Sequence, residues 1–202
     1  MKVIIENTMC YLEENLLPLI LSIKTPKTDS YIMIAAGLGD RTSQSSVLIQ
    51  VGNKLEIFWN KVISACATNL IEVNNKIKVG DKNRQLDHLF EIFEDFPNTY
   101  ILYLESKCCL KFDTEKKPAS NNKIITVAQA IFEKFKKPVK TGYFVPCIRE
   151  VPEEIKKKYP DINIYGVEWL MNTIKCDQFT VDEFFTFFEE VIGPILDEKI
   201  YG

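Results

Sequence analysis

The sequence predicts an α/β (α+β) fold in which a central mixed β-sheet is flanked by helices. Apolar residues recur at helical spacing up to about Ala67, short strand-like segments follow, and a further helix and strand come after them. The chain has 202 residues, of which 46% are hydrophobic and 26% charged, so it can bury a core and is unlike disordered chains. We expect one domain over residues 1–202.

Helices are expected at the N-terminal end. Apolar residues recur every three or four positions in residues 1–23, with a disturbance at Pro18. Ser43 is a suitable N-cap for a helical stretch that reaches about Ala67. Within that stretch, Gly52 predicts a break between two helices.

After Thr68 the apolar pattern becomes typical of strands. Strands are expected over residues 69–73, 76–79, 85–93 and 99–107. A polar loop over 113–122, a helix over 123–136 and a strand over 139–147 should follow. Residues 151–202 are expected to form a helical C-terminal elaboration.

Composition also indicates where the protein resides. The longest apolar run, 16–23, is too short for a membrane span of about 20 residues, and residues 1–7 lack the apolar core of a secretory signal. We therefore expect a cytoplasmic protein without a membrane segment. Its six cysteines show no C-x-x-C spacing and are expected to be buried thiols, outside any disulfide or zinc site. They are Cys10, Cys66, Cys108, Cys109, Cys147 and Cys176.

Charge is distributed unevenly. Between Lys107 and Lys140, nine lysines outnumber three acidic residues, a balance of +6, so the rest of a chain with net charge −3 carries −9. Such a run is often only a solvated surface. It can also neutralise the phosphates of a nucleic acid.

The most informative segment is Tyr100–Lys107, an apolar strand with charged residues at its end. Alternation places Glu105 and Lys107 on one face of that strand, and Asp87 lies in the neighbouring strand candidate. Charged groups at the end of a buried strand are unfavourable unless they pair or bind a ligand. The adjacent His88, the only histidine, should point to the opposite face and is expected to be structural.

These residues resemble the PD-(D/E)-x-K nuclease superfamily. Asp87 matches its first acidic residue, Glu105 the second and Lys107 the lysine, although Leu86 stands where the nominal proline would be. Glu56 resembles a further glutamate that family members often carry on the preceding helix.

The resemblance covers roughly residues 52–145 and implies a restriction-endonuclease-like catalytic core. The D/E-x-K pattern alone is weak, because it recurs at residues 115–117, 154–156 and 197–199. Only the match at 105–107 ends an apolar strand. The alternative is a surface ion pair between Glu105 and Lys107 on an edge strand.

The resemblance implies Mg²⁺-dependent hydrolysis of phosphodiester bonds. Asp87, Glu105 and the Ser106 carbonyl would supply the oxygen ligands that Mg²⁺ prefers. Lys107 would orient the attacking water or stabilise the charged phosphate. Glu56 would hold a second ion or a metal-bound water.

Within the superfamily, a chain this short is most like a type II restriction endonuclease that cuts double-stranded DNA as a homodimer. Large apolar residues between 165 and 195 would contact the second copy or pack over the N-terminal helices. Two alternatives stay open: a repair or structure-specific nuclease with the same metal site, and a non-catalytic DNA-binding protein. Candidates for DNA contact are Arg41, Ser43, Gln44, Asn83, Arg84, Gln85, Lys123 and Lys134.

Overall fold

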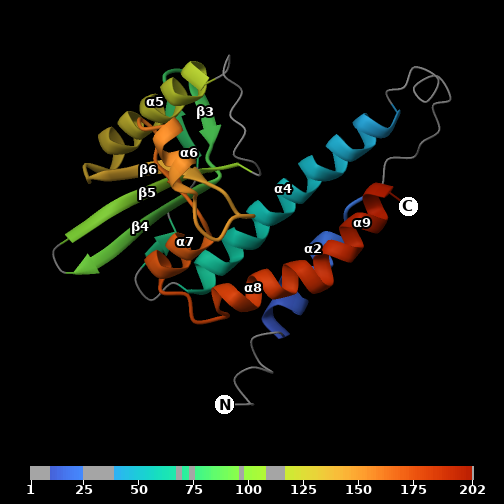
Figure 1. Cartoon of the computed structure of the whole chain (residues 1–202). Helices are drawn as coiled ribbons and strands as arrows, with labels where there is room; N and C mark the ends of the chain where they lie inside the picture. The colour runs from blue at the N-terminus through green and yellow to red at the C-terminus, as the bar shows by residue number, and fades with distance from the viewer. Residues whose placement is uncertain are drawn as a thin grey trace. The chain divides into compact units, whose positions relative to one another are not determined.

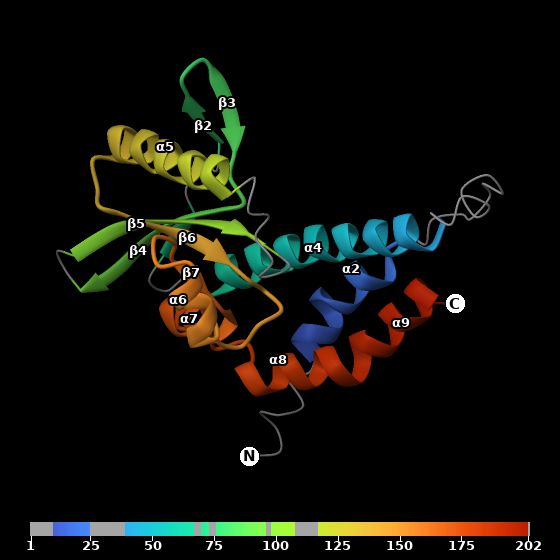
Figure 2. The ribbon, with the colours of Figure 1, turned by 45° about the horizontal axis from the view of Figure 1, so that its top comes forward.

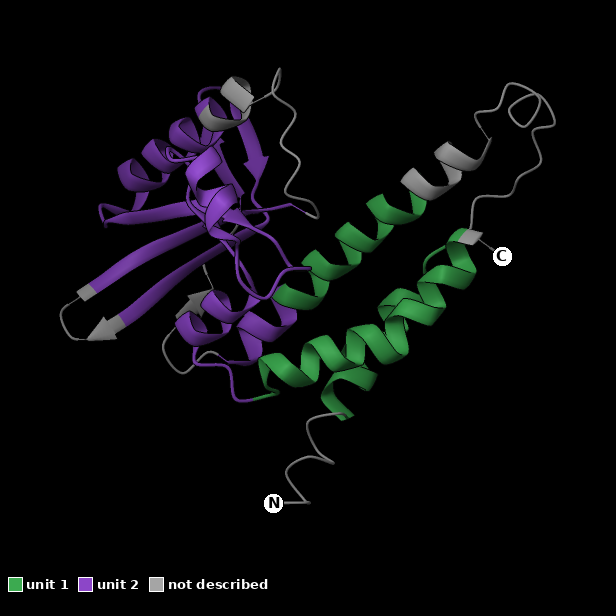
Figure 3. Cartoon of the chain, viewed as in Figure 1, with its two compact units in different colours: residues 1–59, 178–202 green, residues 60–177 purple. Residues whose placement is uncertain are grey.

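The computed structural model describes the chain as two compact units. It covers residues 10–24, 39–66, 70–72, 76–95, 98–107 and 117–201, with only the backbone for 39–45, 70–72, 94–95, 98, 117–121 and 201. Unit 1 comprises residues 1–59 and 178–202, and unit 2 comprises residues 60–177 (Figure 3). The division falls inside one helix, α4 (Gly39–Ala65). The expectation of one domain over residues 1–202 stays a prediction.

Unit 2 is built on a five-stranded mixed sheet (Figure 1). Its order is β1-β4-β5-β6-β7, with antiparallel pairing from β1 through β5 and parallel pairing from β5 through β7. The predicted mixed sheet with flanking helices is therefore confirmed. The strands are β1 (Leu70–Glu72), β4 (His88–Asp95), β5 (Asn98–Ser106), β6 (Val139–Phe144) and β7 (Ile164–Tyr165).

Helix α5 (Lys117–Phe135) connects β5 to β6 and packs on one face of this sheet. Its buried face contacts Ile101 and Tyr103 of β5, and both are fully buried. Leu102 and Leu104, which point to the other face, are also fully buried. The centre of β5 is thus covered on both sides, as an apolar run of this length requires. The α5 side chains in the cluster are Ile124, Val127 and Ile131.

Two smaller parts complete unit 2. A two-stranded antiparallel ribbon, β2 (Lys76–Val79) with β3 (Lys82–Gln85), precedes β4 and buries Ile77 against the α5 side of the sheet. After β6, the helices α6 (Glu153–Lys158) and α7 (Val167–Ile174) flank β7.

Unit 1 is helical. It contains α2 (Leu17–Leu21), α4 up to Trp59, α8 (Val181–Phe187), a π-helical turn (188–192) and α9 (Gly193–Tyr201). Phe58 lies 6.0 Å, between ring centroids, from both Phe179 and Phe184, so the C-terminal aromatic residues pack on α4.

Several expectations about individual elements were wrong. Helix α4 is continuous through Gly52, and α5 begins at Lys117, inside the expected loop. Gln85 belongs to β3 and not to the following strand, and the short β7 interrupts the C-terminal helices. The six cysteines were expected to be buried, but of the four that the structure describes only Cys66 is buried: Cys10 and Cys147 are exposed and Cys176 is partly buried. Cys108 and Cys109 lie outside the described residues. Within the described ranges, no helix is long and apolar enough to cross a membrane.

Candidate functional site

The strand register brings the two predicted carboxylates together. His88 is opposite Leu104 in the antiparallel β4–β5 pair, so continuing the register by one residue places Asp87 opposite Glu105. Residues directly opposite each other project to the same face. Tyr143 of β6 is the parallel partner of Glu105 and joins that face. The site therefore lies at the end of the central strand, on the side that α5 covers.

Asp87 is half-buried and fixed at two points. Its Oδ2 accepts a hydrogen bond from the Ser106 backbone N–H at 2.8 Å, and its carbonyl accepts one from Asn60 Nδ2 at 3.1 Å. Burial, and then the charge of Glu105, raise the pKa of Asp87, against the lowering effects of the Ser106 N–H, Lys123 and Lys107. A carboxylate in this setting is stabilised by any further cation.

Glu105 is the more buried carboxylate, at 5% exposure, and both of its oxygens have partners. Lys123 Nζ, from α5, donates to both oxygens at 2.8 and 2.7 Å, and the Tyr103 hydroxyl donates to Oε1 at 2.7 Å. Burial and the nearby Glu105 raise the pKa of Tyr103. The buried negative charge is thus balanced by one ammonium group and one neutral donor.

Lys107 is the first residue after β5. Its backbone N–H donates to the Phe144 carbonyl at 2.8 Å, which extends the pairing with β6 past Ser106. Its Nζ lies 5.7 Å from the centroid of the Tyr143 ring, and its charge acts to lower the pKa of Asp87. Asp87, Glu105 and Lys107 therefore share one end of the sheet, as the pattern predicted.

A closed circuit of hydrogen bonds supports Asp87 from the opposite face. The circuit runs from the Asp87 carbonyl through the Asn60 amide to His88 Nδ1, and from His88 Nε2 to Ser106 Oγ, with both His88 contacts at 2.8 Å. The Ser106 N–H closes it on the Asp87 carboxylate. Because the Asn60 NH₂ donates to a carbonyl, Oδ1 faces His88, so Nδ1 carries the proton and Nε2 accepts from Ser106.

His88 is fully buried, which lowers its pKa to about 3. This histidine is thus neutral near neutral pH, and it faces away from the carboxylates. The expectation that it is a structural residue agrees with this placement.

Oxygen donors of the kind that hard divalent cations prefer are present here. Asp87 and Glu105 would supply carboxylate oxygens to such a cation, and the Ser106 backbone carbonyl would add a third oxygen. The Ser106 N–H donates to the Asp87 carboxylate. Groups of three or more His, Cys, Asp or Glu side chains with metal-ligand geometry do not occur among the described residues. A cation at this site would therefore keep several water ligands, and the Lys123 ammonium would move away from Glu105.

The other predicted site residues lie elsewhere. Glu56 is in α4, in unit 1, so its role beside the carboxylates of unit 2 stays a prediction. Lys134 is exposed on α5, with Nζ 5.0 Å from the Phe135 ring centroid. Asn83, Arg84 and Gln85 form three of the four residues of β3, where all are exposed. The side chains of Arg41, Ser43 and Gln44 lie outside the described residues.

Two residues of the cluster, Asn60 and Tyr103, were missing from the sequence prediction, as was the pairing of Lys123 with Glu105. The signal for Tyr103 was present, because it lies two positions before Glu105 and so shares its face. Asn60 and the Lys123 contact depend on where helices pack, which periodicity does not give.

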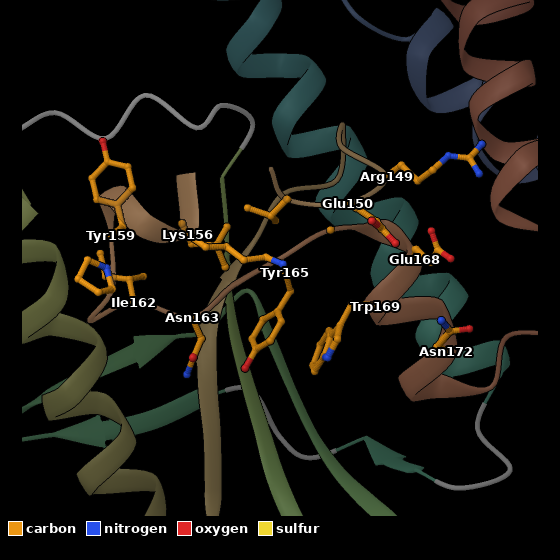
Figure 4. A pocket seen from close by; sticks show the side chains of 14 residues that line it. Arg149, Glu150, Lys156, Tyr159, Ile162, Asn163, Tyr165, Glu168, Trp169 and Asn172 are labelled. Carbon is orange, nitrogen blue, oxygen red and sulfur yellow. The ribbon is translucent and has the colours of Figure 1, made fainter. Parts of the chain in front are cut away.

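Unit 2 also contains a hollow of about 560 Å³ around β7, α6 and α7 (Figure 4). Tyr165 and Trp169 stack in it with ring centroids 3.7 Å apart, and Arg149 and Asn163 also line it. Neither the two carboxylates nor Lys107 lines this hollow.

In comparisons with known proteins, no family model matches the chain, and no curated protein matches it. The interpretation of the site therefore depends on its geometry and on the resemblance of its motif.

Proposed function

We propose that the protein is a Mg²⁺-dependent endodeoxyribonuclease of the PD-(D/E)-x-K type. The observation that supports this most is the grouping of Asp87, Glu105 and Lys107 at the end of adjacent central strands. The order of elements along the chain also supports the proposal, because it is the order expected of a restriction-endonuclease-like core: a helix, an antiparallel set of strands, the helix α5 and the parallel strand β6. An edge-strand ion pair is a poorer explanation, because β5 is central and Glu105 pairs with Lys123 instead.

In the proposed reaction, Asp87, Glu105 and the Ser106 carbonyl hold the cation. When bound, Mg²⁺ lowers the pKa of a coordinated water and neutralises charge that develops on the phosphate. Lys107, beside Asp87, orients the attacking water or stabilises the phosphate oxygens. Lys123, released from Glu105, is close enough to the same site to contact a phosphate of the cut strand.

The proposed substrate is double-stranded DNA, which a type II restriction endonuclease cuts at a short specific sequence. A homodimer would match the two-fold symmetry of a palindromic site. Apolar residues near the C-terminus do not by themselves require it, because Phe179, Phe184 and Phe187 are buried within the single chain, at 2%, 0% and 0% exposure. The homodimer therefore depends on the symmetry argument alone.

Digestion of one sequenced plasmid with Mg²⁺ separates the proposal from its alternatives. A fixed set of fragments supports a sequence-specific endonuclease, and light scattering of the DNA-bound protein then tests the dimer. Preferential cutting of branched duplexes supports a structure-specific nuclease with the same site. A folded protein that binds DNA and cuts neither substrate contradicts the proposed activity.

A further inference from the structure

The ribbon formed by β2 and β3 is a basic, exposed element that directly precedes the site in the chain. Residues 76–85 contain four positive residues and one negative residue, a balance of +3. In Figure 2 the ribbon extends past α5, away from the five-stranded sheet. Its tip is a two-residue turn in which Gly80 has φ +60°, the left-handed value that hairpin turns of this length require. The ribbon is thus a short, well-defined projection.

Register divides the ribbon into two faces. Lys76 pairs with Gln85 and Lys78 with Asn83, and directly opposite residues share a face. All four of these side chains are exposed, and we call them the outer ribbon face. The other face carries the buried Ile77, which packs with α5, and also the exposed Lys82 and Arg84. The outer ribbon face therefore carries two ammonium groups and two carboxamides, with no carboxylate.

These groups match the chemistry of the major groove. Lysine donates to guanine O6 and N7, and asparagine or glutamine forms two hydrogen bonds with adenine. The groove is about 12 Å wide and admits a two-stranded ribbon. Each strand has four residues, which at about 3.3 Å per residue span about four base pairs.

The ribbon also leads directly into the proposed catalytic site. Gln85 ends β3, Leu86 is buried at 1% exposure, and Asp87 follows. Gln85, on the outer ribbon face, therefore lies only two residues along the chain from the proposed metal ligand Asp87. We propose that the outer ribbon face, formed by Lys76, Lys78, Asn83 and Gln85, enters the major groove of duplex DNA and determines sequence preference. This inference rests on the proposed DNA substrate.

Selection from a pool of random duplexes tests the assignment. The full-length chain, with Ca²⁺ in place of Mg²⁺, is used to enrich bound DNA, and the ends produced by Mg²⁺-dependent cutting of the same pool are sequenced. Asn83→Ala and Gln85→Ala are each expected to relax the preference at one or two positions by about 10-fold. Lys76→Ala and Lys78→Ala are expected to lose a guanine preference or to reduce affinity for all sequences. Matched controls are Lys157→Ala on α6 and Asn172→Ala on α7, both exposed and distant in sequence from the ribbon.

Chemical modification identifies the groove. Dimethyl sulfate methylates guanine N7 in the major groove and adenine N3 in the minor groove. If methylation of guanine N7 blocks DNA binding by the parent but not by the ribbon variants, the assignment is supported. If only methylation of adenine N3 blocks binding, the assignment is overturned. Unchanged sequence preference in an Asn83→Ala, Gln85→Ala double variant also overturns it.

The same experiment distinguishes this inference from the proposed nuclease activity. If the protein shows a sequence preference that depends on the ribbon but never cuts DNA, the ribbon assignment is supported and the proposed nuclease activity is contradicted. If it cuts at specific sequences and none of the four ribbon substitutions changes them, the nuclease activity is supported and the ribbon assignment is contradicted. Because the four side chains are exposed, each variant is expected to melt as the parent does, which circular dichroism verifies.

Discussion

Lys123 Nζ lies within 2.8 Å of both carboxylate oxygens of Glu105, so one ammonium group balances a carboxylate that is 5% exposed. In the absence of a divalent cation, this contact offsets much of the free-energy cost of burying the Glu105 charge. The lysine and the proposed Mg²⁺ would therefore compete for the same oxygens.

This competition predicts the behaviour of Lys123→Ala. We expect the metal-free variant to lose about 1 to 3 kcal/mol of unfolding free energy, less than for a fully buried pair because Lys123 is 40% exposed. Mg²⁺ should raise the melting temperature of the variant more than that of the parent. Lys134→Ala, on the same helix, is the control. Equal Mg²⁺-induced shifts in the parent and Lys123→Ala would argue against a shared binding position.

His88 predicts a specific acid sensitivity. Its pKa is about 3 in the folded protein and near 6.5 when unfolded, so below about pH 6.5 the unfolded state binds the additional proton. The contribution of His88 to stability is complete above that pH and should fall by about 1.4 kcal/mol per pH unit as the pH drops towards 3. Urea unfolding of the parent and of His88→Gln at several pH values measures the difference in slope. NMR signals of the single imidazole that titrate near pH 6.5 in the folded protein would refute this account.

Asp87→Asn should make the metal-free protein more stable while abolishing cleavage. Folding raises the pKa of the Asp87 carboxyl. Such a group contributes most to the stability of the fold when the pH is below its unfolded pKa, and it loses this contribution as the pH rises through the folded pKa. At neutral pH the charged Asp87 therefore destabilises the fold, and the neutral amide removes that penalty. Scanning calorimetry in a chelator is expected to show a higher melting temperature at pH 7 and a smaller difference at acid pH. A lower melting temperature at pH 7 would contradict this view of Asp87.

Lys107→Ala separates a catalytic from a structural lysine. Glu105 already pairs with Lys123, so removing Lys107 should change the melting temperature little. Single-turnover cleavage should nevertheless fall about 10²-fold to 10⁴-fold, the usual effect of losing a positioned acid–base group. DNA affinity should stay close to that of the parent. If cleavage per folded molecule equals the parental rate, Lys107 has no part in the reaction.

Much of the fold followed from periodicity, because long apolar strands have a strong signal. The run from Tyr100 to Leu104 identified β5, and alternation placed Glu105 correctly. Gly52 was misleading because the buried neighbours Val51 and Leu55 hold α4 together and override one weak helix former. The polar composition of residues 113–122 favoured a loop, but Pro118 indicates a helix start, because proline is common in the first turn of helices. The early start of α5 was therefore predictable from this residue.

The candidate site was predictable only where it follows from strand register. Asp87 and Glu105 come together through local pairing between neighbouring strands. By contrast, Lys123 reaches Glu105 from a separate helix, and Asn60 reaches Asp87 across 27 residues of sequence. Such contacts depend on tertiary packing, which a single sequence does not specify.

The central claim is that Asp87 and Glu105 hold the cation that drives cleavage. Its most direct test is the rate of Mg²⁺-dependent cutting of a sequenced plasmid by the parent, Asp87→Asn, Glu105→Gln and Glu154→Gln. Glu154 begins another D/E-x-K match, is exposed on α6 and serves as the matched control. We predict fixed fragments from the parent and Glu154→Gln, and no cutting by folded Asp87→Asn or Glu105→Gln. Parental cutting rates in either site variant, or no cutting by the parent, would contradict the account.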